Sequence, residues 1–312
     1  MQGVRASLAA LLAGAIDYAG LFPPASLAMD AAADRYDRHR AGPHRVALGR
    51  FVVAAARLDE LAEAAASLPV PPRAGEAASR WPLSVLVSAP LGADLDRIAR
   101  FNERQGDGPA WHARVEAIET KAGTPDEVRA AARAAGGMEL FVEVPARPVP
   151  LALLEAIRGA GARAKIRTGG TAPDAFPPCD HLAAWLAYCA ASDVPFKATA
   201  GLHHPVRADR SLATAAGEPV VAMHGFLNVL TAAALLHADR IDARTAAALL
   251  DDRDPAAFAF DDDGAAWRGH RLTPPELAAA RAFALGFGSC SFDEPIDDLA
   301  ALGLLAAAPP AS

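Results

Sequence analysis

Short apolar runs alternate with alanine-rich stretches of helical spacing along the first 240 residues, and this alternation constrains the fold more than any other feature. The runs have the length of β-strands, and the stretches between them repeat apolar residues with a helical period. The runs lie near residues 15–22, 46–53, 82–89, 111–119, 138–144, 162–168, 195–201 and 219–224. A strand followed by a helix, repeated eight times, predicts a closed parallel (β/α)8 barrel of the α/β class, a TIM barrel.

The alternation stops after residue 240. The remaining sequence predicts a helix near 243–250, a hairpin over 258–272 and a second helix over 274–285. We therefore predict a barrel over residues 1–240 and a C-terminal appendage of helices and a hairpin over 241–312, packed on the barrel.

The composition excludes several classes of partner. The chain has a formal net charge of −7 and no run of basic residues, so neither a nucleic acid nor an anionic membrane is expected as a partner. No apolar stretch is both long enough and sufficiently free of charge to span a bilayer. The 3 cysteines follow no disulfide or zinc spacing, so a cytoplasmic location is expected.

The alternation of apolar and polar residues within each strand predicts which side chains enter the barrel. Helices cover the outer face of every barrel strand, so that face must be apolar, and polar residues at alternate positions point inward. In the sixth strand Ala164 and Ile166 take the outer face, which turns Lys165 and Arg167 inward. The same test on the other strands turns inward Arg50, Ser88, Glu116, Glu143, Lys197 and Thr199.

Charges inside a barrel are costly unless opposite signs pair and hydrogen bonds are complete. Barrel interiors are usually filled with branched apolar residues, and clusters of buried charges are where pKa values shift most. We therefore predict a functional site at these residues. The alternative is an ion network that only fills the barrel.

The two inward lysines have a chemistry that arginine lacks. Lysine is rare here: the chain has 30 lysines and arginines together, and only Lys121, Lys165 and Lys197 are lysines. A lysine amine can lose its proton and attack a carbonyl, whereas arginine stays charged. Neighbouring strands lie about 4.8 Å apart, so repulsion between two inward ammonium groups is expected to lower the pKa of one of them. Glu116 and Glu143 are predicted to carry protons.

The segments around these lysines resemble a known family. Lys165-Ile-Arg-Thr168-Gly169, followed by Lys197-Ala-Thr199-Ala-Gly201-Leu, is similar to the two-lysine pattern of the deoxyribose-phosphate aldolase family, class I aldolases with a TIM barrel. The resemblance covers about 40 residues. It implies that Lys165 forms the Schiff base and that Lys197 is the neighbouring cation that lowers its pKa.

The chain departs from the family pattern at three places. Arg167 stands where the family has a small residue, His203-His204-Pro205 replaces the loop that binds phosphate, and His224 ends the predicted eighth strand in place of a phosphate cradle. We therefore predict a small anionic carbonyl compound as the substrate, rather than a sugar phosphate. The predicted substrate-binding residues are Arg50, Arg167, Ser88, Thr168, Gly169, Gly170, Thr199, Gly201, His203, His204 and His224.

The sequence thus predicts a Schiff-base-forming aldolase or lyase that needs no cofactor and no metal. One alternative is a metal-dependent lyase or hydrolase that uses His203, His204 and His224, because three histidines at neighbouring strand ends could bind a divalent metal. A second alternative is a non-catalytic binder of an anionic metabolite. The sequence leaves open whether the chain forms a homo-oligomer.

Overall fold

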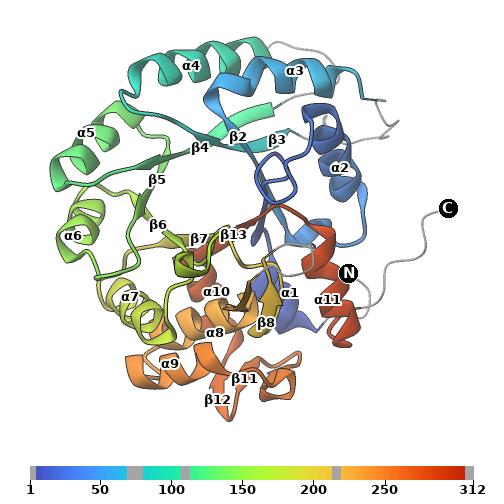
Figure 1. Ribbon diagram of the computed structural model, residues 1–312, viewed down its shortest axis with the longest axis vertical. Helices are drawn as coiled ribbons and strands as arrows, with labels where there is room; N and C mark the ends of the chain where they lie inside the picture. The colour runs from blue at the N-terminus through green and yellow to red at the C-terminus, as the bar shows by residue number, and fades with distance from the viewer. Residues whose placement is uncertain (1–4, 69–79, 107–112, 213–218, 306–312) are drawn as a thin grey trace.

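Eight parallel strands close into a barrel in the order β1-β13-β7-β6-β5-β4-β3-β2, so the predicted TIM-barrel fold is confirmed (Figure 1). The computed structural model describes residues 5–68, 80–106, 113–212 and 219–305. The barrel strands are β1 Ile16–Tyr18, β2 Leu48–Ala54, β3 Trp81–Leu86, β4 Ala113–Lys121, β5 Glu139–Val144, β6 Arg163–Arg167, β7 Phe196–Thr199 and β13 Ala284–Ser289.

Helices form a ring outside the strands, as Figure 1 shows. The helices are α1 Ala6–Leu12, α2 Met29–Ala41, α3 Leu58–Ala66, α4 Gly92–Gly106, α5 Pro125–Ala135, α6 Leu151–Gly159, α7 Cys179–Ala191, α8 Phe226–His237, α9 Ala243–Asp251, α10 Pro274–Phe283 and α11 Asp293–Ala301. Short 3-10 turns cover Arg45–Ala47, Ala55–Arg57, Pro173–Ala175 and Pro255–Ala257. No helix within the four described ranges is long and apolar enough to cross a membrane.

The prediction of the eighth barrel strand at 219–224 is wrong. Residues Val220–Met223 form β9, which pairs with β8, Ala208–Ser211, in a separate antiparallel sheet. The barrel is closed instead by β13, which lies between β7 and β1. Residues 284–289 therefore belong to the barrel, although they lie in the stretch 241–312 that the sequence assigned to an appendage.

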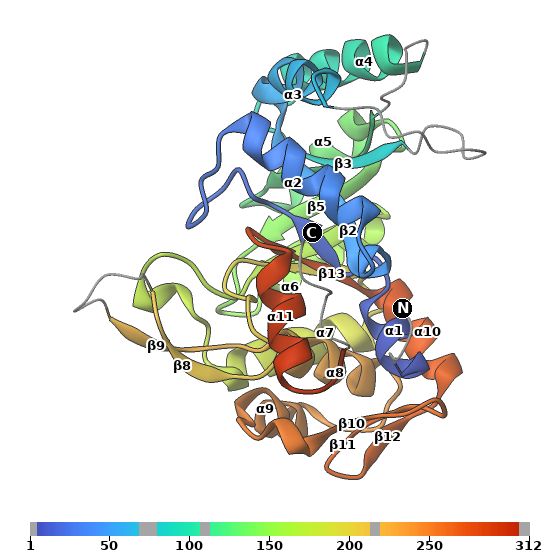
Figure 2. The same cartoon turned by 90° about the vertical axis from the view of Figure 1, so that its right-hand side faces the viewer.

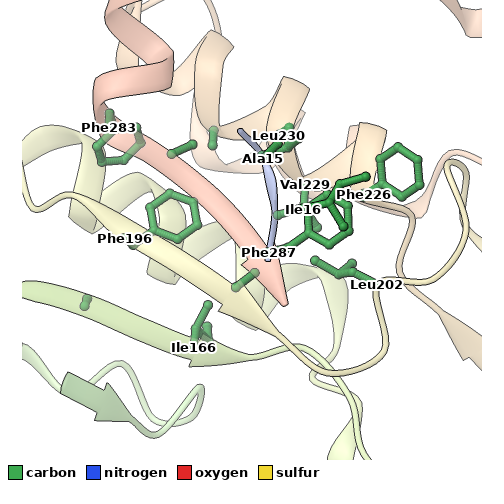
Figure 3. Close-up of a cluster of buried hydrophobic side chains, with 14 of the residues drawn as sticks. Ala15, Ile16, Ile166, Phe196, Leu202, Phe226, Val229, Leu230, Phe283 and Phe287 are labelled. Atoms are coloured by element: carbon green, nitrogen blue, oxygen red, sulfur yellow. The ribbon is translucent and has the colours of Figure 1, made fainter. Parts of the chain in front are cut away.

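The sequence of β13, Ala-Leu-Gly-Phe-Gly-Ser, does not indicate a strand, because it contains two glycines and glycine has low β-propensity. The structure gives the reason for one of its glycines: Gly286 has φ +150°, and a Cβ there would lie 2.6 Å from the carbonyl oxygen of Ala15. Aromatic packing fixes the strand, because Phe287 stacks on Phe226 of α8 with ring centroids 5.1 Å apart (Figure 3).

The predicted hairpin over 258–272 is present. It forms a three-stranded antiparallel sheet of β10 Phe258–Phe260, β11 Ala265–Trp267 and β12 His270–Leu272. Figure 2 shows this sheet beside α9, away from α3 and α4, while the β8–β9 sheet projects from the side of the chain. Both small sheets therefore lie outside the barrel strands.

The outward strand positions that the sequence predicted belong to the apolar core. Leu140 and Val142 of β5, and Ala164 and Ile166 of β6, are buried in the cluster that joins strands to helices. Burial of this continuous apolar layer is the main stabilising contribution in such a barrel. It also leaves the inward positions of the same strands free for charged residues.

Capping residues determine where the helices around this core begin and end, and α5 is an example. Thr124 caps α5 by accepting a hydrogen bond from the backbone N–H of Glu127, whose carboxylate in turn accepts from Gly123 and Thr124. Pro125 occupies the first turn, and Gly136 ends the helix with φ +59°. The chain thus turns sharply after β4, which leaves the end of that strand at the barrel mouth.

Candidate active site

Five ionisable side chains meet inside the barrel and form what we call the upper network. They are Asp17 of β1, Glu119 of β4, Glu143 of β5, Lys165 of β6 and Lys197 of β7. The Nζ atom of Lys165 lies 2.8 Å from Glu119 Oε2 and 3.0 Å from Glu143 Oε2. The Nζ atom of Lys197 lies 2.7 Å from Glu119 Oε1 and also contacts the Asp17 carboxylate. The inward placement of Lys165, Glu143 and Lys197 is as predicted.

Glu119 is the centre of the upper network. Its carboxylate receives one lysine on each oxygen, and the Ser84 hydroxyl donates a third hydrogen bond of 2.6 Å to Oε1. Burial would raise the pKa of Glu119, but Lys197 and Lys165 hold it well below its ordinary value. Glu119 is therefore a fixed anion that two ammonium groups share.

Lys197 is held as a cation, the state that the resemblance implies for it. It is 2% exposed, and burial alone would lower its pKa, but Asp17 and Glu119 raise the pKa above the ordinary lysine value. Its Nζ also lies 5.1 Å from the ring centroid of Phe141, which favours the cation. Repulsion from Lys165, its register partner on β6, is outweighed because a carboxylate lies between the two amines.

The analysis of strand faces missed Glu119 because β4 contains a bulge. Leu83 of β3 pairs with Val115, but the next residue, Ser84, pairs with Ala117, so Glu116 is an extra residue in the strand. A bulge of this kind reverses which residues face inward beyond it. The sequence does carry a signal for this reversal, since Ile118 and Glu119 alternate in the opposite sense to Val115 and Glu116.

Arg50 and Glu116, predicted for the site, lie elsewhere in the barrel. The Arg50 guanidinium lies 2.5 Å from Glu139 and 3.7 Å from Glu116, and Arg163 lies 2.6 Å from Glu139. We call these four residues the lower network. Glu139 and Arg163 are the first residues of β5 and β6, so the lower network lies toward the amino ends of the strands. Active sites of TIM barrels form at the opposite, carboxyl ends.

A cavity of about 490 Å³ opens at the carboxyl ends of β4, β5 and β6. Glu143 lines the cavity and contacts Lys165, so the amine of Lys165 lies one side chain away from it. Three cations also line the cavity, and one of them, Lys121, lies 3.5 Å from Glu143 Oε1. The other two are Arg147 and Arg167. Arg167, which was predicted to point inward, lies at the barrel mouth, where its side chain is exposed.

Loop residues predicted to bind substrate make contacts between β6 and β7. The Thr168 hydroxyl donates to the carbonyl of Ala200 at 2.6 Å, and a Cβ at Gly169 would lie 2.9 Å from the Cα of Gly201. The two loops therefore approach closely, which requires small residues. Thr199 faces β13, since a Cβ at Gly288 would lie 3.3 Å from its hydroxyl oxygen.

Two other predicted residues lie at different places. A Cβ at Gly170 would lie 2.8 Å from the Cβ of Ala175 and 4.0 Å from the guanidinium of Arg167, two residues that line the cavity. Ser88 is exposed beyond the end of β3, where its backbone N–H donates to Asp94, so its predicted inward position is wrong. The strand ends at Leu86, and the inward polar residue of β3 is Ser84.

No protein-family model matches the chain, and the search of curated proteins found no match. Among solved structures, the dihydropteroate synthase of Xanthomonas albilineans, in complex with indole-2-carboxylic acid and 6-chloroguanine, is 12% identical. The alignment covers 96% of each chain with a TM-score of 0.27. A similarity this low carries no argument, so function must be argued from the site itself.

The three histidines of the metal-dependent alternative do not form one site. His224 is fully buried, its Nε2 lies 2.7 Å from the carbonyl of Pro177, and Arg207 lies 3.2 Å from its Nδ1. Burial lowers the pKa of His224 to about 4, so it is neutral and both ring nitrogens are already used. Within the described ranges no group of three histidine, cysteine, aspartate or glutamate side chains is placed to hold a metal.

His203 and His204 instead bond to α11. His203 Nδ1 lies 3.0 Å from Glu294 and 3.9 Å from the thiol of Cys290, and His204 Nδ1 lies 2.6 Å from Asp298. Burial would lower the pKa of His203, but its contacts with Cys290 and Glu294 raise it to about 9. This side of the mouth therefore holds imidazole and carboxylate groups that are paired with each other.

Proposed function

We propose that the chain is a Schiff-base-forming lyase that acts on a small anionic carbonyl compound. The observation that carries the proposal is the position of Lys165, whose buried ammonium contacts the carboxylate of Glu143 at the wall of a positively lined cavity. A lysine that only balanced charge would not need a carboxylate that also faces a cavity. Arginine, used for nearly every other cation of the chain, would serve that role.

In the proposed reaction, Glu143 accepts a proton from the Nζ atom of Lys165 across their 3.0 Å contact. The free amine then attacks the carbonyl carbon, and Glu143 returns the proton to the hydroxyl group, which leaves as water and gives an iminium. Glu143 next takes the proton of the substrate's β-hydroxyl; the adjacent carbon–carbon bond breaks, the first product leaves as an aldehyde or ketone, and the electron pair passes to the iminium to form an enamine. Glu143 returns this proton to the enamine carbon, and hydrolysis of the new iminium by water releases the second product and restores the protonated amine.

Lys197 and Glu119 act on Lys165 through charge. Once Glu143 is protonated, Lys165 shares Glu119 with the permanent cation of Lys197, its register partner on the next strand. Lys197 has a second carboxylate partner, Asp17, and the two carboxylates raise its pKa above the ordinary lysine value. Lys197 therefore stays charged, and we assign the nucleophile to Lys165, whose other partner, Glu143, faces the cavity.

The test is reductive trapping. The purified protein is incubated with borohydride and a panel of aldehydes and 2-oxo acids, and the adduct is located by peptide mass mapping. The assignment is clear because the chain has three lysines, at 121, 165 and 197. We expect the adduct on Lys165, with no adduct in Lys165→Arg and a retained adduct in the matched exchange Arg163→Lys.

An adduct on Lys197 or Lys121, or none across the panel, would contradict the proposal. Stabilisation of the protein against heat by anionic metabolites, without any adduct, would instead favour a binder. The folding of Lys165→Arg is checked by circular dichroism, so that loss of the adduct is not confused with loss of the fold.

A further inference from the structure

The cavity beside Glu143 carries more positive charge than the protein itself neutralises. Its lining includes the cations Lys121, Arg147 and Arg167 against the carboxylates Glu143 and Asp174. Glu143 is already paired, since Lys165 lies 3.0 Å from one of its oxygens and Lys121 lies 3.5 Å from the other. The two arginines thus face a single further carboxylate, the exposed Asp174.

Arg167 is the least satisfied of these cations. Among the residues that the structure describes, its guanidinium has neither an ion pair nor a hydrogen bond. Arg147 uses one nitrogen to donate to the backbone carbonyl of Asp174, at 3.1 Å, and this contact holds its side chain toward the cavity. A guanidinium presents several N–H groups in a planar fork that matches the two oxygens of a carboxylate or phosphate.

The opposite side of the mouth does not suit an anion. Beside β7 and β13, the carboxylates of Glu294 and Asp298 already hold His203 and His204. An anion placed there would have to displace a carboxylate from its imidazole partner. A bound molecule is therefore oriented with its anionic end toward β4, β5 and β6, where the cations of the cavity lie.

We propose that Arg167, Arg147 and Lys121 form an oxyanion subsite that selects carbonyl compounds with a terminal carboxylate or phosphate. This inference rests on the proposed function and gives it a substrate class and an orientation. The same molecule would present its carbonyl carbon toward Lys165 and its anionic end toward Arg167. Lys165 and Arg167 stand two positions apart on β6, which places their Cα atoms about 7 Å apart and suits a chain of a few carbons.

The test compares trapping rates for matched pairs of aldehydes. Butanal and 4-oxobutanoate differ by a terminal carboxylate, and glycolaldehyde and its phosphate differ by a phosphate. In the unmodified protein we expect the anionic member of at least one pair to form the adduct about tenfold faster, which fits the strength of hydrogen bonds to charged groups. The pair with the larger ratio tells whether carboxylate or phosphate is the preferred group.

The variants Arg167→Gln and Lys121→Gln should bring this ratio toward one. The control is Arg129→Gln on α5, an exposed arginine paired with Asp126 on its own helix, which should keep the ratio of the unmodified protein. Equal rates for both members of both pairs in the unmodified protein would overturn the subsite. So would an unchanged ratio in both variants.

A second measurement separates the subsite from the Schiff-base chemistry. Succinate and inorganic phosphate, which cannot form an adduct, are tested for stabilisation of the protein against thermal unfolding. Stabilisation that is lost in Arg167→Gln supports the subsite even if no aldehyde is ever trapped. If adducts form on Lys165 but neither anion stabilises the protein nor favours trapping, the subsite fails and the proposed function stands.

Discussion

The barrel holds two ion networks, and they differ in both cation and burial. The lower network joins Arg50 and Arg163 to Glu116 and Glu139, with side chains 18–40% exposed. In the upper network both cations are lysines, and Glu119 and Lys197 are 2% exposed. The network that water reaches is built with arginine, and the buried network nearer the carboxyl ends of the strands is built with lysine.

The difference fits two physical roles. Arginine keeps its proton and pairs in two directions, so it suits a network that only balances charge and closes the end of a barrel. Lysine pairs less specifically, but it can lose a proton. A buried network built from the more labile cation is therefore difficult to explain by stability alone, because pairs of this kind add little net stability once desolvation is counted.

Removal of the shared carboxylate should have the largest effect. Glu119→Gln leaves two buried ammonium groups without their common partner, so we expect the free energy of unfolding to fall by about 3–5 kcal/mol. The matched variant Glu139→Gln in the partly exposed lower network should cost about 1 kcal/mol. Urea unfolding followed by circular dichroism measures both values. Equal losses would show that the two networks do not differ in the way their burial indicates.

Exchanging lysine and arginine should change the rate of adduct formation in the upper network but not in the lower one. Lys165→Arg keeps the charge but removes the nucleophile, so the rate of adduct formation should fall by roughly 10²-fold or more. Arg163→Lys, two positions earlier on the same strand, makes the reverse exchange and should leave this rate close to that of the unmodified protein. The rate is measured by borohydride trapping with 4-oxobutanoate. If folded Lys165→Arg formed the adduct at the normal rate, the proposed difference in role between the two networks would be wrong.

Alkaline pH should weaken the upper network first. Burial lowers the pKa of Lys197, but Asp17 and Glu119 reverse this and raise it above the ordinary 10.5. Because the folded state favours the protonated amine, this stabilisation is fully present below pH 10.5 and is lost as the pH rises through the folded pKa. Arginine stays charged over this range. The unfolding free energy should therefore fall above pH 10.5, and this decline should be smaller in Lys197→Met, where Tyr18 and Tyr36, whose pKa is raised by burial, still contribute.

Salt should produce the smallest effect, and mainly in the lower network. A double-mutant cycle on Arg50 and Glu139 should give a coupling of about 1 kcal/mol or less, which 1 M NaCl reduces because screening acts on exposed pairs. The same cycle on Lys165 and Glu143, both less than 10% exposed, should change less between low and high salt. A stronger salt response in the buried pair would indicate that water enters the upper network.

Strand faces and spacing predicted most of the barrel and three of the five residues of its upper network. The apolar outer faces of β5, β6 and β7 were enough to turn Glu143, Lys165 and Lys197 inward. Glu119 was missed because a single extra residue in β4 reverses the faces, and the period of two cannot reveal an insertion by itself. Arg50 and Glu116 do face inward. The strand faces predict whether a side chain points into the barrel, but they do not predict how far along the barrel axis it lies.

The remaining errors come from contacts between distant segments. The sequence predicted no strand at β13, whose first two residues it assigned to a helix over 274–285, because the two glycines of β13 oppose a strand locally. Only the neighbouring backbone of Ala15 explains Gly286. His224 appeared beside His203 and His204 because β9 was taken for a barrel strand. Its partners are Pro177 and Arg207 instead. These contacts depend on the pairing of β8 with β9, which the local sequence does not reveal.

Closure by β13 also sets the order in which this protein can be made. Until residues 284–289 leave the ribosome, β1 and β7 have no strand between them and present open edges. The contact of Lys197 with Asp17 joins residues 180 positions apart, and it needs that closure too. The upper network is therefore complete only once residues 284–289 have joined the barrel, so a nascent chain that ends before them would lack the intact site although its first seven barrel strands have been made.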